Sequence, residues 1–185
     1  MTGMSDETRQ LVHTRSITVR GYRLGNGNWE IESRLTDIKA EDIQGLYRLH
    51  IPAGEPIHDM LASVVVSDDM TVLSARASID GAPFPMCADI APAFAALAGL
   101  HLGTGFMREV RARFGGRKGC THLAELMGVI AATAFQTIYP ALRAERGEPP
   151  GRPALIDTCH AFAAEGEVVA RQWPQWSSRD QGSST

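Results

Sequence analysis

The segment of residues 115–123, which reads GGRKGCTHL, holds the side chains best suited to chemistry. Cys120 and His122 stand two positions apart, where a long apolar helix is expected to begin. The free N–H groups of a helix start stabilise an anion and favour a thiolate, and Arg117 nearby is a candidate contact for an anionic ligand group. The alternative is that Cys120 is a small buried residue in a turn and that His122 is structural.

His58 and Asp59 occupy a second polar segment, at the start of an expected strand. An imidazole beside a carboxylate can supply a general base, a pair of metal ligands or a hydrogen bond to substrate. Cys87 follows the proline-containing loop of residues 81–86, which delivers it close to the next helix. The structural alternatives are a turn cap followed by a surface imidazole, and a packed thiol.

These segments are predicted to meet at one sheet edge, where both ends of a strand hairpin approach the start of the long helix. The converging donors are His58, Asp59, Cys87, Cys120 and His122. Nitrogen, sulfur and oxygen donors of this kind fit zinc or iron, with His58, Asp59, Cys87 and Cys120 as the candidate ligands. None of the spacings is the tight C-x-x-C or H-x-x-x-H pattern, so a metal-free site stays open as the alternative.

Two other pairs of residues receive structural interpretations. Glu32 and Asp37 are a candidate carboxylate pair, but we interpret them as charged residues on the exposed face of an outer strand. Cys159 and His160 are interpreted as packing and surface residues.

Four strands are expected to position the first polar segments. They span residues 13–24, 29–38, 57–66 and 70–80, and a loop covers residues 39–56. One face of the second strand carries Trp29, Ile31, Ser33 and Leu35, which alternate with charged residues. Since successive side chains of a strand point to opposite faces, this pattern predicts a sheet that is buried on one side.

Three helices are expected after the strands: residues 89–97 capped by Asp89, residues 105–114 capped by Thr104, and residues 121–139, which end before Pro140. Strands followed by helices predict an α+β fold, with an antiparallel sheet of about four strands and three or more helices packed on one face. We expect a flexible N-terminus over residues 1–12, a single domain over residues 13–176 and a disordered tail over residues 177–185. The segment of residues 155–176 is expected to add a short helix and an extended piece.

Composition limits the classes of partner. The chain has 185 residues, with 18 Lys and Arg against 21 Asp and Glu, which gives no electrostatic reason to expect nucleic acid or an anionic membrane. A small-molecule substrate is the expected partner, and a homo-oligomer is one alternative for the assembly. The first residues lack a secretory signal, and the three cysteines are odd in number, so we expect a cytoplasmic protein without a disulfide framework.

The sequence resembles a bacterial family catalogued only as a domain of unknown function, over about residues 13–176. The matching motifs, in order, are RGYR at residues 20–23, WEIE at 29–32, LTD at 35–37, PIHDM at 56–60, Cys87, GCTHL at 119–123 and TAFQT at 133–137. Members of that family are met beside genes for the breakdown of aromatic or CoA-linked compounds. The resemblance therefore implies a role in small-molecule catabolism.

A second resemblance is to iron-sulfur scaffold and sulfur-acceptor proteins of the NifU and SufE type. It is carried by a G-x-P loop at residues 54–56, by Cys87 after the hairpin and by Cys120 at the start of the long helix. This resemblance implies a NifU/SufE-like fold. His58 stands where the scaffold pattern has its first cysteine, so iron-sulfur assembly does not follow from it.

Three hypotheses result. The preferred one is an enzyme without a nucleotide cofactor that performs proton-transfer chemistry, of the lyase or isomerase type, on a small catabolic substrate, with an aromatic compound as one candidate. His58 with Asp59 would be the acid or base, Cys120 with His122 a second acid, base or nucleophile, and Arg117 with Cys87 substrate contacts. The alternative is a zinc, iron or iron-sulfur binding protein without turnover. The third is a binding or dimerisation module in which Cys120 is structural.

Overall fold

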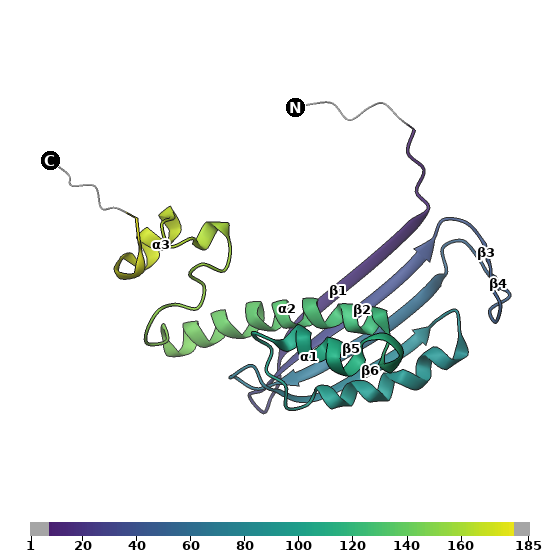
Figure 1. Ribbon diagram of the computed structural model, residues 1–185, viewed down its shortest axis with the longest axis horizontal. Helices are drawn as coiled ribbons and strands as arrows, with labels where there is room; N and C mark the ends of the chain where they lie inside the picture. The colour runs from purple at the N-terminus through teal and green to yellow at the C-terminus, as the bar shows by residue number, and fades with distance from the viewer. Residues whose placement is uncertain (1–7, 180–185) are drawn as a thin grey trace. The chain divides into compact units, whose positions relative to one another are not determined.

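The computed structural model describes residues 8–179 of the chain, drawn in Figure 1. Its internal contacts divide the chain into two compact units, residues 1–140 and residues 141–185. The predicted flexible N-terminus and disordered tail lie largely outside the described residues. The single domain over residues 13–176 stays a prediction.

The first unit is built on a four-stranded antiparallel sheet. Its strands are β1 (His13–Arg23), β2 (Trp29–Lys39), β5 (Pro56–Val66) and β6 (Val72–Gly81), in the spatial order β1-β2-β5-β6. The predicted α+β fold and antiparallel sheet are confirmed. Strand β2 lies between β1 and β5, so the prediction that it is an outer strand is wrong.

The connection between β2 and β5 is more ordered than expected. Two short strands, β3 (Ile43–Gln44) and β4 (His50–Ile51), pair within the segment that was predicted to be a loop. They form a small hairpin beside the end of the main sheet at which β5 begins (Figure 1).

Strand β2 shows how one face of the sheet is buried. Trp29, Ile31, Ser33 and Leu35 are buried as predicted, and the alternation continues for one more step to Asp37. The side chains between them are partly or fully exposed. Asp37 therefore shares the apolar face of the sheet instead of the solvent face.

Helices α1 (Phe106–Phe114) and α2 (Thr121–Arg146) lie over the sheet in Figure 1, joined by the short 3₁₀ helix η2 (Gly116–Lys118). The predicted apolar stripe of α2 is buried throughout: Leu123, Leu126, Met127, Ile130, Ala134 and Ile138. A longer 3₁₀ helix, η1 (Pro85–Leu97), packs beside β6, and its Phe94 stacks on Phe114 with 4.4 Å between the ring centroids. These contacts form the core of the first unit.

The predicted helix boundaries need correction. The helix expected to be capped by Asp89 begins at Pro85, because proline is tolerated in a first turn, where its missing N–H is not needed. Gly105, with a φ of 90°, takes the cap position expected for Thr104. Helix α2 continues through Pro140 to Arg146, since the strong helix formers that follow the proline, ALRAER, resume the helical pattern.

The second unit has a small core of its own around Ile156, Val169 and Trp173. It contains α3 (Glu167–Gln172) and the single-turn helices η3 (His160–Phe162) and η4 (Pro174–Trp176). The extended piece predicted here is replaced by turns and short helices in the described residues. Over residues 8–179, none of the helices combines the length and the apolar character that crossing a membrane requires.

Candidate functional site

Three side chains from three neighbouring strands form a row across one end of the sheet. The register pairs Arg15 of β1 with Asp37 of β2, and Asp37 with His58 of β5. Directly opposed residues of adjacent strands point to the same face, so the row lies on the side that the helices cover. Non-local strand pairing thus assembles a guanidinium, a carboxylate and an imidazole.

Asp37 is the centre of this row and is only 1% exposed. Arg15 donates two parallel hydrogen bonds to its two carboxylate oxygens, each 2.8 Å long. These two hydrogen bonds lower the pKa of Asp37 to about 2. Burial acts in the opposite direction, and the hydrogen bond with His58 adds to the lowering. The same pairing raises the pKa of Arg15 above its ordinary value. The buried carboxylate is therefore ionised at neutral pH.

His58 Nδ1 lies 3.0 Å from Asp37 Oδ2, within hydrogen-bond distance. The carboxylate can only accept, so Nδ1 carries the hydrogen, and in the neutral form of the ring Nε2 holds the lone pair. His13 reaches the same carboxylate, with 3.2 Å between its Nε2 and Asp37 Oδ1. The buried Nδ1 of His13 finds no hydrogen-bond partner among the described residues.

The first turns of α2 complete the site from the other side. His122 stacks obliquely on His58, with 4.0 Å between the ring centroids, and its Nε2 lies 3.8 Å from Asp37 Oδ2. Burial, followed by the nearby charges of His58 and Arg15, lowers the pKa of His122, so this imidazole is neutral at pH 7. Glu125, one turn further along, accepts a 2.7 Å bond from Arg15 and joins α2 to the row.

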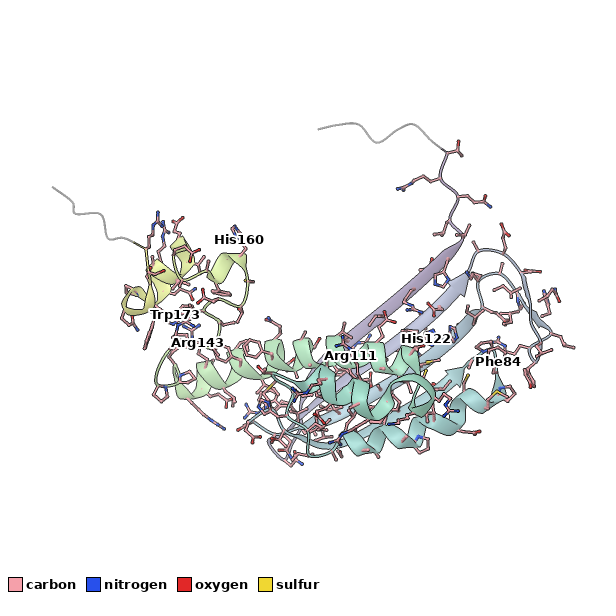
Figure 2. All side chains as sticks on the ribbon, viewed as in Figure 1. Phe84, Arg111, His122, Arg143, His160 and Trp173 are labelled. Atoms are coloured by element: carbon pink, nitrogen blue, oxygen red, sulfur yellow. The ribbon has the colours of Figure 1, made fainter. Side chains whose placement is uncertain are left out.

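A cavity of about 530 Å³ opens beside the two histidines. Its polar lining includes His58, Cys87, Asp89, Arg117, Cys120 and His122, and its apolar lining is Met60, Pro83, Phe84, Met86 and Ile90. Cys120 Sγ lies 3.9 Å from His122 Nδ1. Figure 2 shows His122 near the start of α2 and Phe84 close to the β3–β4 hairpin.

Most of the predicted site residues meet at this cavity, but Asp59 does not. His58, Cys87, Arg117, Cys120 and His122 all line it, as the sequence predicts. Asp59 follows His58 in the strand and therefore points to the opposite face, where Arg34 donates bonds of 2.8 and 2.5 Å to its carboxylate. The predicted pairing of Asp59 with His58 is wrong, and Asp37 takes that role.

Arg15 and His13 are site residues that the sequence did not predict, and Asp37 was predicted only as an exposed member of a carboxylate pair. The signal for Asp37 was present, because one further step in the alternation of Trp29, Ile31, Ser33 and Leu35 reaches residue 37. The sequence predicts an exposed Asp37 because a charged residue on an outer strand is ordinarily solvated, whereas β2 is an interior strand. No local pattern marked Arg15 or His13, which depend on the pairing of β1 with β2.

The described residues contain one group with metal-binding geometry: Asp37, His58 and His122, whose ligand atoms lie within 4.8 Å of one another. This group differs from the predicted ligand set, since it replaces Asp59 and both cysteines by Asp37 and His122. Arg15 disfavours the binding of a metal cation here, because its two hydrogen bonds engage both carboxylate oxygens of Asp37 and place a positive charge beside them. The arrangement fits an oriented imidazole better than a metal centre.

Comparison with known proteins places the site within a family segment. Residues 13–136 match the family described as "Protein of unknown function (DUF2889)". Every member of the row, both histidines of the cavity and both of its cysteines lie inside these residues. Neither the curated proteins nor the solved structures yielded a match. The likeness to NifU and SufE proteins stays a prediction.

Proposed function

We propose a proton-transfer function for this chain, which belongs to the DUF2889 family. The protein would be an enzyme without a nucleotide cofactor that moves a proton on a small organic substrate, in a reaction of the lyase or isomerase type. One observation carries the proposal: His58 lines a cavity while its Nδ1 is held 3.0 Å from a buried, ionised carboxylate. The prediction of an aromatic substrate is not needed for this proposal.

The carboxylate gives His58 the properties of a general base. By accepting the Nδ1 hydrogen, Asp37 selects the tautomer in which Nε2 can receive a proton, and it stabilises the imidazolium that then forms. Arg15 keeps Asp37 ionised, because its two hydrogen bonds lower the pKa of that carboxyl to about 2. The proton taken from substrate would therefore reside on His58 Nε2, and Asp37 would remain a carboxylate.

His122 and Cys120 would supply the second group of the reaction. The lowered pKa of His122 keeps its imidazole neutral, so it can donate a hydrogen bond to a developing negative charge without itself being a cation. Cys120 lies beside it and is the alternative proton donor. Arg117, which also lines the cavity, would hold an anionic group of the substrate.

Exchange of substrate hydrogen with deuterium oxide tests this function. We would follow by proton NMR the C–H signals of a panel of small carboxylic, hydroxy and keto acids in the presence of the protein. General acid–base catalysis accelerates a reaction by roughly 10²–10⁴-fold, so His58→Gln should lower the exchange rate by at least about 100-fold. Asp37→Asn should also lower the exchange rate, because the carboxylate no longer selects the His58 tautomer in which Nε2 can accept a proton.

His50→Gln is the matched control, because His50 also faces a carboxylate, Asp42 at 2.9 Å, but on the exposed β3–β4 hairpin. It should leave exchange unchanged. Exchange that is equally fast in His58→Gln would rule out the proposed base.

Metal binding is the second candidate, favoured by the mutual proximity of Asp37, His58 and His122. Elemental analysis of protein purified without chelator distinguishes the two functions. Stoichiometric zinc or iron that is lost in His122→Asn and retained in His50→Gln would support a metal centre. Exchange activity that survives complete removal of metal would support the metal-free base.

A further inference from the structure

The lining of the cavity beside His58 mixes polar and apolar side chains. Among the described residues, the polar groups include the histidines, the cysteines and Arg117, and the apolar groups include Met60, Phe84 and Ile90. Its volume of about 530 Å³ lies within the range of small-molecule sites. A ligand that contacts both kinds of side chain would therefore be amphipathic.

Arg117 determines the charge that such a ligand should carry. Over residues 8–179, it is the one Lys or Arg side chain lining this cavity, and it makes no hydrogen bond or ion pair within that part of the chain. Asp89 lines the same cavity without forming an ion pair with Arg117, so the guanidinium is not neutralised. A guanidinium without a partner offers a forked pair of donors to a carboxylate.

Phe84 is the one Phe, Tyr or Trp side chain among the described residues that line the cavity. Its ring lines the cavity and is held edge-to-face by Tyr47 of the β3–β4 hairpin, with 6.0 Å between the ring centroids and 87° between the planes. Aromatic pairs of this geometry are favourable, so Tyr47 restrains the ring that borders the cavity. Truncation of Phe84 would extend the space available to an apolar ligand.

We propose that the cavity binds a small organic anion with an unbranched or flat apolar body. Arg117 contacts its carboxylate, Met60 and Ile90 pack against the body, and Phe84 sets the upper limit of its size. The assignment of this ligand as the substrate rests on the proposed proton-transfer function. Binding of the anion does not require that function.

Calorimetry on the full chain tests the charge preference with three probes: hexanoate, its neutral analogue hexanamide, and acetate. Hexanoate should bind more tightly than either, because only it offers both the charge and the apolar body. Arg117→Gln should weaken hexanoate binding by about tenfold, the effect of one lost charge-assisted contact, and should leave hexanamide unchanged.

Arg111→Gln is the matched control for charge. Arg111 is exposed on α1 and is absent from the cavity lining. The inference is overturned if hexanoate does not bind, if hexanoate and hexanamide bind equally, or if Arg117→Gln behaves like Arg111→Gln.

Phe84→Ala tests the size limit. It should improve decanoate binding relative to hexanoate, whereas Tyr22→Ala, which removes a ring of similar exposure from β1, should not. If the ratio of the decanoate and hexanoate affinities is unchanged in Phe84→Ala, then Phe84 does not limit the size of the ligand.

His58→Gln separates this inference from the proposed function. It should lower proton exchange by at least about 100-fold, whereas the anion contact is tested separately by the effect of Arg117→Gln on hexanoate affinity. If exchange persists in His58→Gln but Arg117→Gln still weakens hexanoate, the proposed base is wrong and the ligand class stands. If exchange is lost in His58→Gln but Arg117→Gln does not weaken hexanoate binding, the ligand class is wrong and the base stands.

Discussion

At the scale of single residues, the site is organised around Asp37. Its carboxylate faces Arg15, His58, His13 and His122, and every one of these neighbours presents nitrogen to it. A carboxylate buried to this extent is tolerated only when donors replace the water it has lost. Asp37 is thus both a buried charge whose ion pairs stabilise the first unit and the group that orients His58.

The low pKa of Asp37 predicts a specific loss of stability in acid. In the unfolded chain this carboxyl binds its proton near pH 3.8, and in the folded chain near pH 2. The unfolded state therefore binds more protons between these values, so the free energy of unfolding should fall as the pH drops from about 4 to about 2. His122 adds a loss of the same sign that begins below about pH 6.5, because folding lowers its pKa too.

Urea unfolding at a series of pH values measures this dependence. Asp37→Asn should be less stable at neutral pH by about 3 kcal/mol, since Arg15 loses its buried partner, and should lack the fall between pH 4 and 2. Asp80→Asn, which alters an exposed carboxylate on β6, is the control. An Asp37→Asn variant with the full acid dependence of the parent protein would contradict the assignment.

At the scale of elements, the site depends on how closely α2 approaches β1. Gly21 makes this approach possible, because a Cβ at that position would lie 2.1 Å from Thr137 Oγ1 and 2.7 Å from its Cγ2. The start of the same helix carries His122 to His58 and Glu125 to Arg15. A glycine on β1 and a threonine on α2 therefore control the spacing of two elements that both supply site residues.

Gly21→Ala should destabilise the protein by roughly 1–3 kcal/mol, because the added methyl group overpacks the contact between β1 and α2. The double variant Gly21→Ala with Thr137→Ala should recover part of this loss, since it removes the two closest atoms. Gly25→Ala, which meets nothing within 4 Å, is the control for the change in backbone entropy. Thermal unfolding of the four proteins checks the prediction, and a double variant no more stable than Gly21→Ala alone would refute it.

At the scale of the whole molecule, the candidate site lies within one of the two units. The cavity, the row on the sheet and the family match all fall within residues 13–136, inside the first unit. The second unit has its own small core of Ile156, Val169 and Trp173. The chemistry is therefore expected to belong to the first unit alone.

A chain that ends at Arg146, the last residue of α2, should retain hexanoate affinity and proton exchange within about twofold, because the second unit contributes no residue to the cavity lining in residues 8–179. Calorimetry and deuterium exchange on the shortened chain check this. A shortened chain that folds, as judged by circular dichroism, but neither binds nor exchanges would show that the second unit is needed.

Local patterns in the sequence determined the elements and many of the candidate residues. Alternation with a period of two located the strands, and the apolar stripe from Leu123 to Ile138 located α2, because both periods follow from backbone geometry within a few residues. The polar segments at His58, Cys87 and Cys120 were also predicted to converge, and they line one cavity. Each of these inferences needed only neighbours in the chain or the order of elements.

Only the tertiary structure decided which carboxylate serves His58. The sequence places Asp59 beside it, but adjacent strand residues face opposite ways, and the partner is Asp37, 21 positions earlier. That choice depends on β2 being an interior strand and on a register that aligns Arg15, Asp37 and His58. Strand order and register arise from packing between segments distant in sequence, so no local pattern encodes them.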